Sequence, residues 1–203
     1  MSRIPPALLT RRPHEDRPGQ PVLEGIELAL GRVHELCGPA RRTLAVMVAA
    51  RTTGPVFWIL PAWQKERLNP QGMVQFLDPA RLTFIEAPRA EDLLWSAEEC
   101  LRAGVVPLVV TDLPDPPGLT PVRRLHLAAE AGGEDGRMLP LGLLLTPGDG
   151  GAPGVESRWC MAPSHGPDTT EWSLSRTRAR TAPVQDWQVV AGREGLRAVR
   201  MGG

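Results

Sequence analysis

Short apolar runs alternate with amphipathic stretches over the first three quarters of the chain. A short, continuous apolar run is typical of a strand buried on both faces of a parallel sheet. Such runs span residues 33–37, 55–61, 82–88, 105–114 and 139–147. The stretches between them predict helices over residues 41–51, 89–104 and 121–132. This alternation predicts βαβ units and therefore an α/β fold with a mostly parallel sheet flanked by helices.

The helix predicted over residues 89–104 has the clearest signals in the sequence. Leu94, Ala97 and Leu101 form an apolar stripe, and we expect Trp95 beside them to be part of the core. Acidic residues occupy its first turn, where the helix dipole favours negative charge. Gly104 follows its last turn, where glycine commonly ends a helix. For the next predicted helix, Thr120 is expected to be the N-terminal cap.

The pattern changes after the glycine-rich stretch GDGGAPG. Short segments of alternating polarity predict antiparallel strands at the C-terminus, between about residues 155 and 200. One of them spans residues 171–180, and every second residue of a strand lies on the same face. That face is apolar over its first half and basic over its second half. We expect this face to bind a partner through Trp172, Arg176, Arg178 and Arg180.

The chain of 203 residues is long enough to bury a full core, and residues 23–203 are predicted to form a single domain. Residues 1–22 are rich in proline and arginine and are expected to form a flexible arm. They contain no apolar run long enough for a signal sequence, and no later run would span a membrane. The expected location is therefore the cytoplasm.

Charge and cysteine usage narrow the function classes. The 23 basic and 23 acidic residues cancel, so no global field draws the protein to nucleic acid, and contact with DNA is expected to be indirect or weak. The three cysteines are scattered and do not have the spacing of metal ligands. No metal site is expected.

The turn from Gly38 to Thr43 lies where a phosphate-binding loop would stand, between a strand and a helix. A working loop reads GxxxxGK[ST], with backbone amides around the phosphates and a lysine that reaches them. Here only four residues separate Gly38 from Thr43, and the sole lysine of the chain, Lys65, lies beyond the next strand. Arg41 and Arg42 supply charge but no cradle of amides.

Asp112 closes the segment VVPLVVTD (residues 105–112), at the position where nucleotide-binding folds place the acid that holds water on magnesium. An aspartate after a strand also caps turns, so this position alone is a weak signal. The degenerate nucleotide-site positions are therefore Gly38, Arg41, Arg42, Thr43 and Asp112. No catalytic residue is predicted, and neither ATP nor magnesium is expected as a cofactor.

The segments GRVHELCGP and LNPQGMVQFLDPARLTFIEAPRAEDLLWSAEECLRAGVVPLVVTDLP resemble the ATPase core of RecA-type recombinases in order and spacing. EDLLWSAEECLRAG, VRRLHLAAEAG and ESRW resemble ImuA-type proteins, the RecA-like and SulA-like accessory proteins of bacterial SOS mutagenesis. The resemblance covers roughly residues 24–190. It implies a RecA-like fold, yet of the recombinase catalytic parts only Asp112 has a match, and Thr146 stands where recombinases have a glutamine.

The resemblance also implies partners for error-prone translesion synthesis. These are an ImuB-like inactive Y-family polymerase homologue, a DnaE-type error-prone polymerase and RecA itself. Arg123 and Arg124 are expected to touch phosphate or an acidic partner, unless they merely form a solvated helix face. Two other functions stay open: a diverged RecA-like ATPase that uses Arg41, Arg42 and Asp112, and a SulA-like inhibitor of cell division.

Overall fold

The computed structural model describes residues 18–134, 138–192 and 195–202, and nine strands of these residues form one mixed sheet. Their bounds are β3 (Val33–Cys37), β4 (Val56–Pro61), β5 (Leu82–Ala87), β6 (Leu108–Asp112), β7 (Leu141–Leu145), β8 (Ser157–Pro163), β9 (Thr170–Ala179), β10 (Gln185–Gly192) and β11 (Gly195–Arg200). The order across the sheet is β11-β10-β9-β8-β3-β7-β6-β4-β5. Strands from β8 to β5 pair in parallel, whereas β8 to β11 are antiparallel neighbours.

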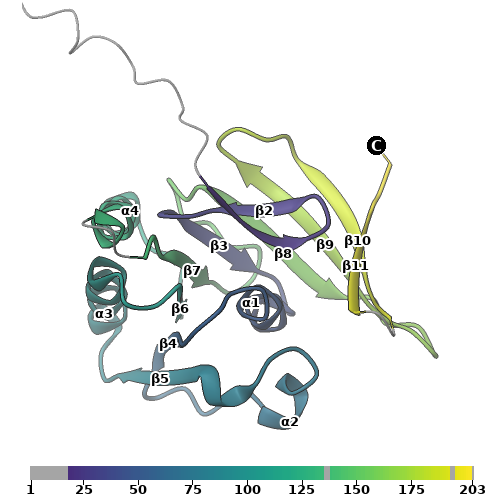
Figure 1. Ribbon diagram of the computed structural model, residues 1–203, viewed down its shortest axis with the longest axis horizontal. Helices are drawn as coiled ribbons and strands as arrows, with labels where there is room; N and C mark the ends of the chain where they lie inside the picture. Colours follow the sequence, from purple (N-terminus) through teal and green to yellow (C-terminus); the bar gives the residue numbers. More distant parts are fainter. Residues whose placement is uncertain (1–17, 135–137, 193–194, 203) are drawn as a thin grey trace, which may run out of the picture.

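Helices and a hairpin cover the sheet from both sides. The remaining elements are β1 (Gly19–Leu23), β2 (Ile26–Ala29), α1 (Arg41–Ala49), α2 (Pro70–Met73), the 3-10 turn η2 (Pro79–Arg81), α3 (Ala90–Ala103) and α4 (Leu119–Gly132). Figure 1 shows α3 and α4 on one side of the sheet, with α1 and the β1–β2 hairpin on the other. In the part of the chain that the structure describes, no helix combines the length and apolar character needed to cross a membrane.

The three middle strands explain the continuous apolar runs. Every residue of β3, β6 and β7 is buried, because helices cover both faces of the sheet there. Leu36 and Trp58 pack on the side of α1, while Val33 and Val109 pack on the side of α3 and α4. The predicted α/β architecture, with a mostly parallel part and C-terminal antiparallel strands, is confirmed.

Several local predictions need correction. Residues 19–22, assigned to the arm, belong to β1, and residues 1–17 of the predicted arm lie outside the described residues. The buried face of α3 runs through Leu93, Ala97 and Leu101, so Trp95 is 61% exposed instead of being part of the core. Trp95 follows Leu93 by two positions, which places it about 200° around the helix. Gly118, not Thr120, precedes the first residue of α4.

A bulge in β9 divides the predicted basic face. Arg176 pairs with Trp159 and Arg178 pairs with Arg158, which leaves Thr177 without a partner in β8. One extra residue reverses the side on which every later side chain lies. Arg178 and the following Arg180 therefore do not share the face of Arg176, and the prediction of one continuous face is wrong.

Candidate functional site

The carboxyl ends of β3, β6 and β7 meet at one edge of the parallel part of the sheet. The chain leaves β3 for α1 on one side of the sheet, and leaves β6 for α4 on the other side (Figure 1). Open α/β sheets bind ligands at such a switch in direction. The structure therefore places the predicted nucleotide-site positions at the expected edge.

The turn that follows β3 is closed by its neighbours. Gly38 has a φ of +83°, and a Cβ at this position would lie 2.5 Å from the carbonyl oxygen of Met161. The Gly38 amide donates to the carbonyl of Gly148 at 2.8 Å, and the Ala40 amide donates to that of Met161 at 3.0 Å. These amides already donate to protein carbonyls, so they are not free to hold a phosphate.

Arg42 and Asp112 come together across this edge. The Nε of Arg42 lies 2.7 Å from Oδ2 of Asp112, whose side chain is only 3% exposed. The neighbouring Arg41 donates from Nη1 to the carbonyl of Gly38 at 3.3 Å, and its buried Nε has no hydrogen-bond partner within the described ranges. The guanidinium of Arg42 thus neutralises the one acid that matches a nucleotide site.

Thr43 lines a small cavity between α1 and α2, together with Arg42. The cavity has a volume of about 180 Å³ and is lined mainly by apolar side chains, among them Val46, Met73 and Phe76, with Arg42 at its edge. Among the described residues, the polar side chains that line it are Arg42, Thr43 and Asn69. The structure therefore brings Arg42 and Asp112 together, whereas among the described residues Thr43 shares a cavity with Arg42 but makes no hydrogen bond to Asp112.

Glu35 is a polar anchor that the sequence analysis missed. Its carboxylate is fully buried in β3 and accepts hydrogen bonds from Thr146 Oγ1 at 2.7 Å, Gly151 N at 2.8 Å and Ala152 N at 3.0 Å. Arg158 pairs with the same carboxylate. These contacts tie the loop after β7 to β3, and that loop supplies the carbonyl that caps Gly38. The available signal was a lone glutamate within an apolar run.

His34 and Cys37 flank Glu35 on the same strand. Ser157 Oγ accepts from Nε1 of Trp159 and donates to Nδ1 of His34, while Nε2 of His34 donates to the carbonyl of Ala29. Burial lowers the pKa of His34 to about 4, so the ring is neutral. Burial and the nearby Cys160 thiol raise the pKa of Cys37, which keeps it a thiol and a poor nucleophile.

The residues predicted to bind partners on β9 have mostly internal roles. Trp172 is 6% exposed and belongs to the core. The guanidinium of Arg176 lies 5.4 Å from the ring centre of Trp159 and 5.3 Å from that of Trp187, which are cation–π distances. Arg178 is exposed. Burial and the bulge therefore separate the members of the expected interface.

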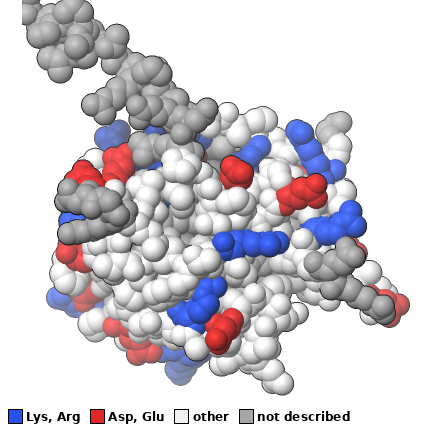
Figure 2. Space-filling model, viewed as in Figure 1, with Lys and Arg blue, Asp and Glu red and all other residues white. Residues whose placement is uncertain are grey.

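Two of the predicted arginines do come together, beside α4. Arg123 and Arg180 line the same groove, although 57 residues (180 minus 123) separate them in the chain. Arg124 points to the other side of α4 and pairs with Glu98 at 2.7 Å. Basic and acidic side chains are scattered over the face seen in Figure 2, and the net charge of the chain is zero. Any attraction of a charged ligand to this groove would therefore come from its own arginines.

In the described part of the chain, no three His, Cys, Asp or Glu side chains gather in a way that would hold a metal ion. Comparison with known proteins adds no assignment: neither a protein-family model nor a curated protein matches this sequence.

Proposed function

We propose that this protein is a non-catalytic, RecA-like accessory protein of damage-induced mutagenesis, acting in the cytoplasm. It helps to assemble an error-prone translesion synthesis complex in the SOS response. The observation that carries the proposal is the Arg42–Asp112 ion pair beside a turn whose Gly38 and Ala40 amides already bind carbonyls. A frame of this kind favours a role in binding proteins over a role in hydrolysis.

The strand order supports the RecA-like part of the proposal. β3 leads into the turn at Gly38, and the next strand in sequence, β4, lies three places away beyond β7 and β6. This order brings the end of β6, with Asp112, near the turn that follows β3. Together with the sequence resemblance, it is the arrangement expected of a nucleotide-binding ancestor whose site has degenerated.

The geometry also argues against ATP hydrolysis. Phosphoryl transfer depends on donors and cations that are positioned around the phosphates before the reaction begins. Here Asp112 could hold a water on magnesium only after separating from Arg42, and the closed turn offers no cradle at Gly38. Either change would cost contacts that now hold the fold together.

The proposed partners follow from the resemblance to ImuA-type proteins. They are an ImuB-like inactive Y-family polymerase homologue, a DnaE-type error-prone polymerase and RecA, with indirect or weak contact to DNA. The test is a deletion in the host bacterium, complemented with the wild-type gene or with Asp112→Ala, followed by counting mutants after DNA damage. We expect deletion to abolish the induced mutagenesis and both genes to restore it.

Failure of a folded Asp112→Ala protein to restore mutagenesis would contradict the scaffold role. Purification of a tagged chain from damaged cells provides the second readout. Recovery of the Y-family homologue and the DnaE-type polymerase would support the proposal. Recovery of the tubulin-like division protein instead would favour a SulA-like inhibitor.

A further inference from the structure

A groove runs along the outer side of α4, with a volume of about 360 Å³. One wall is the helix itself, which contributes Leu119, Arg123 and Leu127. Arg180, just after β9, lies on the opposite wall, where the bulge in that strand directs it. The groove thus joins segments that are far apart in the sequence.

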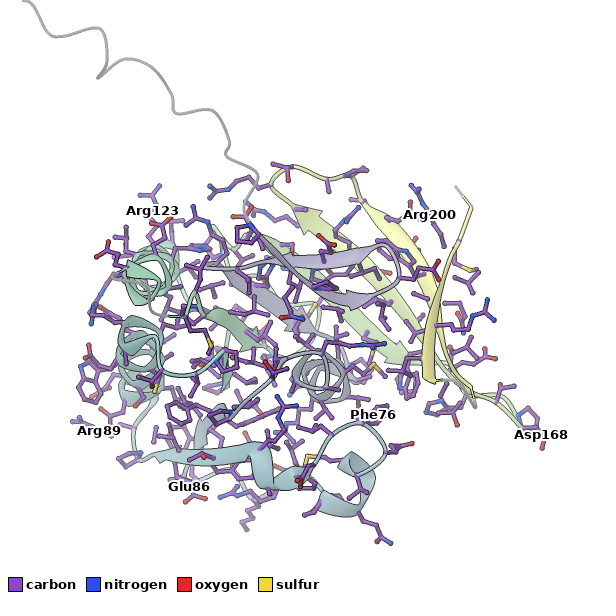
Figure 3. All side chains as sticks on the ribbon, in the orientation of Figure 1. Phe76, Glu86, Arg89, Arg123, Asp168 and Arg200 are labelled. Atoms are coloured by element: carbon purple, nitrogen blue, oxygen red, sulfur yellow. The ribbon has the colours of Figure 1, made fainter. Side chains whose placement is uncertain are left out.

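The helix wall carries apolar side chains on either side of a cation. Leu119, Arg123 and Leu127 are spaced four residues apart and so lie along one face of α4. Leu119 is 40% exposed and Leu127 is 64% exposed. Arg123 is exposed, and within the described residues it has neither a hydrogen bond nor an ion pair; Figure 3 shows it on the outer side of α4.

The opposite wall offers a second available cation. Arg180 is 54% exposed and forms a loose ion pair with Glu156, in which Nε lies 3.8 Å from Oε2, too far for a hydrogen bond. Among the described residues that buried oxygen has no hydrogen-bond partner, and it lies 3.6 Å from Nε of Arg32. Arg32, in contrast, is held at 2.6 Å by Glu130 and is mostly buried. The two arginines that can turn toward a ligand are therefore Arg123 and Arg180.

The floor of the groove is fixed in place. His126 accepts from the amide of Val33 through Nδ1 at 3.2 Å and contacts the carbonyl of Gly154 through Nε2 at 3.0 Å. Burial lowers the pKa of His126, which favours the neutral ring that this arrangement requires. Gly154 has a φ of +82° and approaches Leu119 so closely that a Cβ would lie 2.7 Å from it. A floor held in this way needs little ordering when a ligand binds.

We propose that this groove docks a short, acidic, amphipathic segment of a partner protein. Apolar side chains of the segment would cover Leu119 and Leu127, while its carboxylates pair with Arg123 and Arg180. Charge complementarity selects an acidic ligand, and the exposed leucines select one with an apolar face. Arginine forms two parallel hydrogen bonds with a carboxylate, which fixes the register of the segment.

A peptide fits this groove better than nucleic acid does. Among the described residues that line it, the one aromatic ring is that of His126, which is buried and bonded through both nitrogens, so bases would find no exposed ring on which to stack. Glu130 is part of the lining, and Glu156 lies 3.8 Å from Arg180. A phosphate backbone carries a charge at every nucleotide and would meet these carboxylates, whereas a peptide can place its few carboxylates opposite the arginines and keep apolar residues elsewhere. The docking surface does not depend on the proposed role in mutagenesis, since it can be tested on the purified chain alone.

The test is a selection of peptides from a random display library against the full chain. We expect the enriched peptides to combine Asp or Glu with Leu, Ile or Phe. Their affinity, measured by fluorescence anisotropy, should fall at least about tenfold in Arg123→Glu and in Arg180→Glu, because each reversal turns an attraction into a repulsion. Leu127→Ser should weaken the same peptides without a change of charge.

Arg197→Glu is the matched control, because Arg197 is also exposed and has no ion pair among the described residues. It pairs with Val190, which pairs in turn with Glu171, so it stands at the far end of β9 from Arg180. Glu171 and Arg180 are nine residues apart along the chain, which is about 30 Å in an extended strand. The control should leave the affinity unchanged.

Three results would overturn the proposal. Enriched peptides without acidic residues, or peptides that bind Arg123→Glu and Arg180→Glu as well as they bind the wild type, would remove the groove as their site. Binding of single-stranded oligo-dT that Arg123→Glu abolishes would make the groove a nucleic-acid site. Urea unfolding of each variant shows that the fold is intact, and none of these results bears on the mutagenesis assay.

Discussion

Arg42 and Asp112 pair at 2.7 Å across the edge of the sheet where a nucleotide would bind, with the guanidinium partly exposed and the carboxylate almost fully buried. The pair is asymmetric. If Asp112 is removed, Arg42 can turn to solvent. If Arg42 is removed, a charge stays buried without a partner.

This asymmetry predicts unequal effects of the two single variants. Arg42→Met should lower the free energy of unfolding by about 2–3 kcal/mol, whereas Asp112→Leu should cost about 1 kcal/mol or less. The double variant Arg42→Met/Asp112→Leu should recover most of the loss. Urea unfolding measures all three. Strictly additive losses in the double variant would show that the two side chains do not interact.

The closed turn predicts that Gly38 tolerates no side chain. Gly38→Ala would force a Cβ against the Met161 carbonyl, which is backbone and cannot move aside, at a φ that alanine disfavours. We expect a loss of about 3 kcal/mol or more in urea unfolding. Gly25→Ala is the control, because Gly25 has a φ of +72° with open space around it. It should cost only about 1 kcal/mol. Equal losses would mean that the turn is not closed.

The buried His34 predicts a stability that falls with acidification. Its folded pKa of about 4 is below the ordinary 6.5, so the unfolded chain binds the proton first. The stability that His34 contributes is complete above pH 6.5 and is lost as the pH falls toward 4, at up to about 1.4 kcal/mol per pH unit. The free energy of unfolding measured between these limits should therefore decline.

In His34→Asn this part of the decline should be absent. In His165→Asn, at an exposed position, it should persist. An identical pH profile for His34→Asn and the wild type would contradict the assignment.

Arg176 is predicted to serve the fold instead of a partner. Arg176→Gln removes a cation from two tryptophan rings and should lower the free energy of unfolding by about 1–2 kcal/mol, with a change in tryptophan fluorescence. Arg178→Gln, at an exposed position past the bulge, should stay within about 0.5 kcal/mol of the wild type. If Arg178→Gln were the more damaging of the two, the arginine roles would be reversed.

Much of the fold could be predicted from the sequence, because the strands buried on both faces are continuous apolar runs. The position of Asp112 at the end of such a run could be read in the same way. Its contact with Arg42 could not, since it depends on the order of strands across the sheet. The hairpin of β1 and β2 was missed because the proline-rich composition before it was taken to continue through residue 22.

The arginines predicted to bind a partner show most clearly what the sequence pattern could not predict. Strict alternation placed Arg176 and Arg180 on one face, and no feature of the sequence marks Thr177 as the bulged residue. The groove beside α4 combines a helix position with a residue that only this bulge brings to that side. Pairings of this kind are tertiary, so local patterns do not encode them.

The central claim is that the site at Arg42 and Asp112 no longer receives a nucleotide and that the protein acts by binding other proteins. Calorimetric titration of the full chain with ATP and magnesium tests it most directly. The account predicts no saturable heat even in the millimolar range. Micromolar binding that Arg42→Met or Asp112→Leu abolishes would contradict it and would support a diverged ATPase instead.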